Sequence, residues 1–302
     1  MREWDVLGVG AVSVDVTGTI PEWPRPGTKV QLEDLELCDG GLIGTALVAV
    51  SRLGGSACFL GRMGYSEWAL RAVEQLAREG VDTSLVIREK GSGPHFAIVL
   101  TLQSDGQRTI FYSKSAVRYP DSAHVPADAW LGRTRALLFD SGSGQAGLSF
   151  AREARRAGIP VVIDAEQMTP KLDDLLHSTD HVVIPEELAS EIHPGWHRES
   201  DPAELRFRAD QTVVVTLGAD GCIASCPREG VCRLPAFRVK VVDTTGCGDV
   251  FHGAYALGVA RGLDLAARCR LASGAAALAA TRLGGRNGIP TEDALLRFLR
   301  ER

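Results

Sequence analysis

Short runs of β-branched residues alternate with helical segments along the middle of the chain, and this rhythm limits the fold more than any other feature. Strand-like runs and helical segments follow one another at 136–140, 146–157, 160–164, 172–177, 181–184, 185–191 and 212–218. Apolar runs of this length are typical of a parallel sheet that helices cover on both faces. The sequence therefore predicts an α/β fold with a doubly wound, mostly parallel sheet.

Polar residues stand where several of the predicted strands end. These residues are Asp15, Asp140, Asp164, Thr216 and Asp243. Open α/β sheets bind their ligands at the carboxyl ends of the strands. We therefore expect these side chains to lie around one site.

Two segments do not fit the alternation of strands and helices. Residues 16–39 are rich in proline and then alternate in polarity, and 92–114 contain two strand-like runs around Ser104-Asp-Gly-Gln. Proline disfavours a central strand, and an Asp-Gly pair between apolar runs is a strong hairpin signal. We expect residues 1–302 to form one domain, with these two segments inserted as a small second β-sheet, or lid.

Bulk properties exclude several classes of protein. The 302 residues carry a formal net charge of −5 and contain no basic run, which argues against nucleic acid or an anionic membrane as a partner. No apolar run is long enough to span a membrane, and the start does not resemble a signal peptide. Seven scattered cysteines, without a Cys-x-x-Cys pair, favour reduced thiols in the cytoplasm.

The stretch 241–254 carries the clearest chemical signal. Val241 and Val242 are predicted to end a buried strand, a turn follows at 246–248, and Asp249 opens an apolar helix. Free N–H groups and the helix dipole make such a turn a site for anions. A carboxylate beside it suits a general base that takes a proton from an attacking hydroxyl. Helix capping by Asp249 is the alternative, but it leaves the Gly-x-Gly unexplained.

Several motifs resemble those of the ribokinase-like (pfkB) carbohydrate kinases. Residues 243–251, Asp-Thr-Thr-Gly-Cys-Gly-Asp-Val-Phe, resemble that family's signature, D-T-x-G-A-G-D-x-F. Residues 40–55 resemble its G-G-N-x-x-N-x-A motif ending in R-L-G, with Leu42 and Thr45 in place of the two Asn. Residues 216–221 resemble the nucleotide-binding turn T-L-G-x-x-G. The resemblance spans nearly the whole chain and implies the ribokinase-like fold.

The same resemblance implies an activity. It is the transfer of the γ-phosphoryl group of ATP to a sugar hydroxyl, with Asp249 as the base. The N–H groups of Gly246, Cys247 and Gly248 would stabilise the charge of the phosphoryl group in transfer. In the family the lid closes over the sugar and often forms a dimer interface, which implies a homodimer through the lid.

Individual site residues follow from the position of each motif. The implied sugar contacts are Ser13, Asp15, Lys29, Gly40, Gly41, Thr45 and Asp140. The implied nucleotide contacts are Thr216, Gly218, Gly221, Gly248 and Ser273. A monovalent cation such as K⁺ would be held at Asp243, Thr245, Ala279, Arg282 and Gly284. Mg²⁺ would bridge the phosphates, with Glu187 linked to it, although Pro185 replaces the Asn of the family's N-x-x-E motif.

The acceptor sugar stays open at this stage. Residues 235–254 and the tail 284–290 are similar to the sulfofructose kinase branch, and Lys29 could pair with an anionic sugar group. That branch has an Arg in the segment that begins at Asp140, where this chain has none. A ketose, another hexose derivative and a nucleoside are all compatible with the motifs.

Two other classes of protein fit the sequence less well. The Asn residues missing at 42, 45 and 185 would suit a sugar- or nucleotide-binding regulator with little or no activity, but an inactive relative has no need for Asp249 beside an intact glycine turn. A dinucleotide-binding dehydrogenase requires Gly-x-Gly-x-x-Gly after the first strand, and residues 8–13 lack the third glycine.

Overall fold

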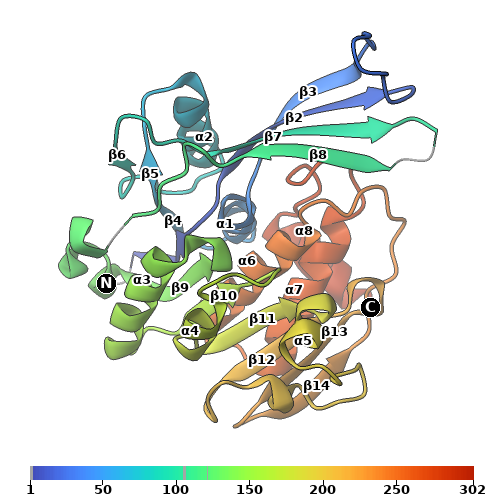
Figure 1. Cartoon of the computed structure of the whole chain (residues 1–302). Coiled ribbons are helices and arrows are strands. Elements are labelled where there is room, and N and C mark those ends of the chain that lie inside the picture. Colours follow the sequence, from blue (N-terminus) through green and yellow to red (C-terminus); the bar gives the residue numbers. More distant parts are fainter. Residues whose placement is uncertain (1–2, 105–106, 121) are drawn as a thin grey trace.

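The fold is built on an eight-stranded sheet (Figure 1). The computed structural model describes residues 3–104, 107–120 and 122–302. The strands lie in the order β14 (Gly230–Leu234), β13 (Cys222–Cys226), β12 (Thr212–Thr216), β11 (His181–Pro185), β10 (Val161–Asp164), β9 (Thr134–Asp140), β1 (Trp4–Val9) and β4 (Ala57–Leu60). The six strands β4, β1, β9, β10, β11 and β12 pair in parallel, and β13 and β14 add an antiparallel edge. The predicted doubly wound, mostly parallel sheet is confirmed.

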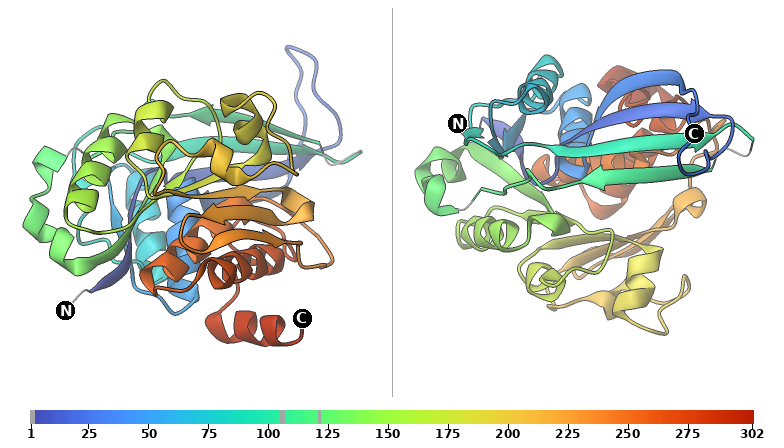
Figure 2. Two further views of the ribbon diagram at one scale, coloured as in Figure 1. Left: turned by 90° about the horizontal axis from the view of Figure 1, so that it is seen from below. Right: turned by 45° about the horizontal axis from the view of Figure 1, so that its top comes forward.

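Helices cover both faces of this sheet (Figure 2). They are α1 (Leu42–Arg52), α2 (Glu67–Arg78), α3 (Gln145–Arg156), α4 (Leu172–His177), α5 (Glu186–Ile192), α6 (Cys247–Ala260), α7 (Leu265–Ala279) and α8 (Glu292–Arg300). Side chains alternate across a strand, so Val161 and Ile163 join the core under α3, α4 and α5, whereas Val162 joins the core under the other helices. The strands supply mainly β-branched and other apolar side chains to both cores, and large side chains such as Phe59 and Trp130 complete them.

A second sheet of four strands forms the lid (Figure 1). Its order is β3 (Glu33–Gly40), β2 (Ser13–Ile20), β7 (His95–Leu102) and β8 (Arg108–Ser113), and a separate pair joins β5 (Arg62–Met63) to β6 (Ile87–Arg88). Strands β7 and β8 pair antiparallel on either side of the predicted hairpin, whose tip at 105–106 lies outside the described residues. Because only residues 10–12 separate β1 from β2, the lid begins directly after a strand of the central sheet.

The prediction that Asp15 stands at the end of a strand of the parallel sheet is wrong. The chain leaves the central sheet after Val9, and a Cβ at Gly10 would lie 2.2 Å from an oxygen of Asp140. Only a residue without a side chain can make the bend so close to that carboxyl group. Asp15 therefore lies within lid strand β2 rather than at the end of a central strand.

The prediction that Val241 and Val242 end a buried strand, with Asp243 at its end, is also wrong. Both valines are more than half exposed and lie in the loop between β14 and α6. The N–H groups of Val242 and Asp243 donate to the carbonyl of Ala280, just past the end of α7. Two β-branched residues favour a strand locally, but here the backbone bonds to the end of a helix instead.

Close packing of α1 on α6 brings the starts of these two helices together. A Cβ at Gly253 would lie only 2.1 Å from the carbonyl oxygen of Ala46, so the two backbones are almost in contact. Glycine is the one residue that allows such an approach. The glycine turn before α1 and the glycine turn before α6 therefore belong to one region of the molecule.

Candidate active site

The turn before α6 is built to bind an anion. Gly246 caps the helix in the left-handed conformation, with φ of 73° and ψ of 0°. Among the described residues, no hydrogen bond engages the backbone N–H groups of Gly246, Gly248 and Asp249. The Cys247 N–H donates to the carbonyl of Thr244 at 3.2 Å, so a phosphate could share this donor but would not have it alone. Free donors at a helix start, together with the dipole, attract negative charge.

Asp249 lies in the first turn of α6 but does not cap it. The helix begins at Cys247 rather than at Asp249, and Gly246 takes the N-cap position. The capping alternative is therefore wrong. Asp249 is partly exposed, and burial together with neighbouring carboxyl groups raises its pKa well above the ordinary value. A carboxyl group that is costly to charge and has no cap to form is the kind of group that accepts a proton readily.

Three carboxyl groups at the ends of β9 and β10 act electrostatically on Asp249. Those of Asp164, Glu166 and Asp140 all raise its pKa, and the positive charge of Arg286 opposes them. Asp164 ends β10, is fully buried and lies 3.4 Å from Nδ1 of His252. The ionisation of Asp164 and that of Asp249 depend on each other, because both side chains lie in one poorly solvated region.

Asp140 ends β9 and contacts the backbone. One of its oxygens accepts from the N–H of Ala11, and the other from the N–H of Ser143 at 2.8 Å. Its side chain is only 1 % exposed, and burial raises its pKa to about 6. It holds the β1–β2 link against the end of β9, next to the predicted sugar contacts.

The predicted sugar contacts come together where the lid meets α1. Ser13 pairs with Gly40 across β2 and β3, and its hydroxyl donates to Asp15 at 3.1 Å. A Cβ at Gly40 would lie 2.7 Å from the same carboxyl oxygen of Asp15, and Gly41 turns into α1 with φ of 86°. Thr45 follows in the first turn of α1 and is buried. This cluster offers a hydroxyl-rich and acidic surface of the kind that binds sugar hydroxyls.

Lys29 does not join this cluster. It is exposed in the loop between β2 and β3, at the end of the hairpin opposite Ser13 and Gly40. The strand from Ser13 to Ile20 spans roughly 23 Å at about 3.3 Å per residue. The arrangement provides no support for pairing between Lys29 and a group on the sugar.

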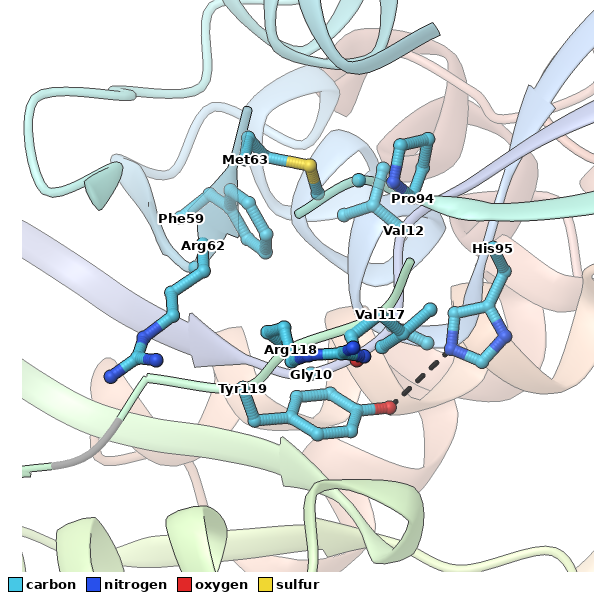
Figure 3. A pocket seen from close by; sticks show the side chains of 13 residues that line it. Gly10, Val12, Phe59, Arg62, Met63, Pro94, His95, Val117, Arg118 and Tyr119 are labelled. Carbon is cyan, nitrogen blue, oxygen red and sulfur yellow. Dashed lines mark hydrogen bonds between the residues drawn. The ribbon is translucent and has the colours of Figure 1, made fainter. Parts of the chain in front are cut away.

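A small pocket lies beside the sugar cluster (Figure 3). Apolar side chains line much of it, and the hydroxyl of Tyr119 lies 3.4 Å from Nε2 of His95 at its edge. His95 pairs with Ser13 in the lid sheet, so the pocket borders the cluster directly. Burial, and after it the negative charge of Asp140, raises the pKa of Tyr119, so its hydroxyl stays protonated and can donate.

The predicted nucleotide contacts follow β12. Thr216 ends this strand, Gly218 opens a short 3₁₀ turn, and Gly221 closes it with φ of 103°. A Cβ at Gly221 would lie 2.0 Å from the carbonyl oxygen of Leu234, so the turn is compact. Ser273 lies on α7 with its hydroxyl 3.7 Å from the thiol of Cys222 on β13. These residues therefore flank one side of the sheet edge.

The predicted cation ligands are joined by hydrogen bonds between loops. One oxygen of Asp243 accepts from the N–H and hydroxyl of Thr245 at 2.9 and 2.7 Å, and the other accepts from the N–H of Gly284 at 2.9 Å. The N–H of Arg282 contacts the carbonyl of Ala279 at 3.4 Å. The Asp243 carboxylate thus joins the loop before α6 to the loop after α7.

Glu187 is exposed on the first turn of α5, and its neighbour Glu186 is paired with Arg198 at 2.6 Å. Across residues 3–104, 107–120 and 122–302, no group of three or more His, Cys, Asp or Glu side chains is arranged to hold a metal ion. A magnesium ion would therefore depend on phosphate oxygens and water for most of its ligands.

Sequence reasoning assigned no role to Arg286, Glu166 or Tyr119. Arg286 stands in the glycine loop 284–288 and reaches the sugar cluster from the far end of the chain. A lone arginine between glycines is a usable signal, since glycine loops often carry a side chain into a site. Tyr119 and Glu166 follow strands without a motif around them, and nothing in the sequence pattern marks them.

Known proteins are similar to this chain in sequence and in fold. Residues 5–292 match the pfkB family of carbohydrate kinases. The chain is 24% identical over 299 residues to a ribokinase of Haemophilus influenzae, which covers 96% of this chain and 97% of the relative. It is 30% identical over 313 residues to an aminoimidazole riboside kinase of Salmonella typhimurium, covering 96% and 93%. A structure of Arabidopsis thaliana ribokinase complexed with ribose and ATP superposes with a TM-score of 0.86 at 23% identity over 99% of both chains.

The chain therefore belongs to the pfkB family of carbohydrate kinases. The predicted family, fold and enzyme class are confirmed. No helix in the described part of the chain is long and apolar enough to cross a membrane.

Proposed function

We propose that the protein transfers the γ-phosphoryl group of ATP to a hydroxyl of a sugar or sugar derivative, with Asp249 as the base. Asp249 takes the proton of the attacking hydroxyl as the oxygen bonds to phosphorus. The N–H groups of Gly246 and Gly248, with a share of that of Cys247, bind the phosphoryl oxygens during transfer. Positioning and electrostatics account for most of the catalysis in such a loose transition state.

One observation carries this proposal: the carboxyl group of Asp249 and a turn with free N–H groups lie at the start of α6, and a cluster that fits sugar hydroxyls lies at the start of α1 beside it. The contact between Gly253 and Ala46 sets the two helices against each other. Arg286 contacts Thr45 at 3.3 Å, and its charge also acts on Asp249. A hydroxyl bound at the cluster would therefore lie near the base.

ATP fits the two remaining parts of the site. The compact turn Gly218–Asp220 and Ser273 on α7 suit the ribose and the adenine ring of ATP. The turn at Gly246 suits the phosphates. Mg²⁺ would neutralise the phosphates, with Glu187 near them. K⁺ would fit between the loops that Asp243 joins to Gly284. The cation would fix the loop that precedes the anion turn.

The experiment that tests this function is a substrate panel. ATP consumption is measured with hexoses, ketoses, sugar phosphates, sulfosugars and nucleosides, with and without Mg²⁺ and K⁺. We expect turnover with at least one neutral sugar or a nucleoside. The aminoimidazole riboside kinase among the relatives favours including ribosides. No turnover with any compound would refute the kinase function and support a binding regulator.

The lid also carries an apolar face that suits a second copy of the chain. The strand pairing aligns Leu37, Ile98 and Phe111 across the sheet through Val16, and Leu35 extends the row. Leu35 is 62 % exposed and Phe111 is 54 % exposed. A continuous row of exposed apolar side chains on a sheet is typical of an interface. The protein is therefore proposed to be a homodimer that pairs through this face.

A further inference from the structure

Arg286 is a buried cation that reaches into the sugar cluster. It lies in the loop between α7 and α8 and is only 8 % exposed. Its Nε donates to the hydroxyl oxygen of Thr45 at 3.3 Å, and its Nη2 donates to the carbonyl of Gly40 at 2.7 Å. A Cβ at Gly44 would lie 2.5 Å from Nη2, so the glycine leaves the space that the guanidinium fills. The C-terminal loop is thereby fixed to the start of α1.

The backbone at Arg286 is itself supported. Arg52, in the last turn of α1, donates from Nη1 to the carbonyl of Arg286 at 2.7 Å. The same Arg52 pairs with both carboxylate oxygens of Glu79 at 2.7 and 2.8 Å. Two hydrogen bonds of this kind hold a guanidinium in one orientation. Arg52 therefore supports the loop from outside the site, and Arg286 projects from that loop into it.

The positive charge of Arg286 interacts with carboxylates of the sugar cluster and with the proposed base. Burial lowers its pKa to about 10, so the side chain is still charged at neutral pH. Its charge acts on Asp15 in the sugar cluster and on the base Asp249, as well as on Asp39 and Glu79. A buried charge is stable only beside groups of opposite sign. The charge of Arg286 therefore acts both on Asp15 in the sugar cluster and on the proposed base, Asp249.

Two polar groups at this position are left for a ligand. Among the described residues, no hydrogen bond engages Nη1 of Arg286. Because Thr45 accepts from Nε, its own hydroxyl hydrogen is available as a donor. A sugar hydroxyl offers both an acceptor and a donor, and it can satisfy both groups.

We propose that Arg286 is a substrate-positioning residue of this kinase, which orients Thr45 and Gly40 and donates from Nη1 to an oxygen of the acceptor sugar. This inference rests on the proposed function. The guanidinium of Arg286 would replace part of the polar contact with the sugar that Leu42 and Thr45 do not provide. The competing explanation is that Arg286 only holds the loop in place.

The test compares Arg286→Lys, Arg286→Gln and Arg286→Met, using ATP and the best acceptor from the substrate panel. We expect KM for the acceptor to rise about 10- to 100-fold in all three variants, because each loses charge-assisted hydrogen bonds. KM for ATP should stay within about twofold. A loop-holding role alone would change both constants or neither, so the split between them distinguishes the two explanations.

The pH profile of kcat provides a second readout. Asp164, Glu166 and Asp140 face Asp249 and disfavour its charged form, whereas Arg286 favours it. Loss of the positive charge in the Gln and Met variants should move the acidic limb of kcat to higher pH. The Lys variant keeps the charge and should keep the wild-type limb. Equal profiles for Lys and Met would contradict the proposed role.

Matched variants separate this role from a loss of stability. Arg268→Met removes another buried arginine, which lies away from the sugar cluster and pairs with Glu229 at 2.7 Å. This variant should have a lower Tm and an unchanged KM for the acceptor. Thr45→Val removes the acceptor of Nε and should reproduce the rise in KM. If Arg286→Met does not fold, Arg286→Lys and Thr45→Val decide. If the wild-type protein is active and KM for the acceptor is unchanged in both variants, the inference is overturned. An inactive wild-type protein would refute the proposed function as well.

Discussion

The substitution Gly246→Ala probes the anion turn through its backbone. Gly246 has φ of 73°, a conformation that costs an alanine about 1–2 kcal/mol. Its Cβ would also lie 2.7 Å from the carbonyl oxygen of Gly285, so the loop or the turn must shift. A shift that misaligns one donor to the transferring group costs roughly 10²- to 10³-fold in kcat. We therefore expect at least a tenfold loss of kcat.

Gly262→Ala is the matched control. Gly262 follows α6, has φ of 68°, and a Cβ there would meet no atom within 4 Å. It should pay the same conformational cost, which lowers Tm by about 2–4 °C per kcal/mol, and keep kcat within about twofold. Both variants are assayed for phosphoryl transfer by coupled ADP detection and for unfolding by calorimetry. A Gly246→Ala variant with the kcat of the control would refute the anion turn.

Three further predictions concern the base, the thiol and the lid. The raised pKa of Asp249 means that kcat falls as pH decreases through a limb above the usual Asp value of about 4, and a flat profile down to about pH 4.5 would contradict this. Cys247→Ala should keep kcat within about threefold in steady-state assays, because only the amide faces the phosphates; a loss above tenfold would indicate a role for the thiol. If the proposed dimer pairs through the lid, Phe111→Glu should sediment as a monomer, whereas Leu296→Glu on α8 should not; a monomeric wild type would exclude the lid interface.

Much of the fold could be predicted because its signals are local. Val161-Val-Ile and Val213-Val-Val are buried β-branched runs followed by helices, and their periodicity needs no knowledge of distant contacts. The errors arose where a distant contact decided the conformation. Val241 and Val242 resemble a strand, yet their loop bonds to the end of α7. The first strand bends at Gly10 because Asp140 lies against it.

One part of the candidate site could be predicted from a local motif, and the other part could not. Gly246 and Asp249 lie a few residues apart in one turn, so a short motif predicts their arrangement. Ser13, Gly40 and Arg286 come from three separate parts of the chain and meet only in the folded protein. The arginine among glycines marks the C-terminal loop, but no local pattern shows that this loop reaches a cluster formed near the N-terminus.

The kinetics of Asp249→Asn test the central claim most directly. The substitution keeps the size of the side chain and removes the base, and positioned general bases contribute about 10²- to 10⁴-fold. We predict a folded protein that binds ATP with unchanged affinity by calorimetry and loses phosphoryl transfer by that factor. A variant that turns over sugar at near wild-type rate would contradict the account.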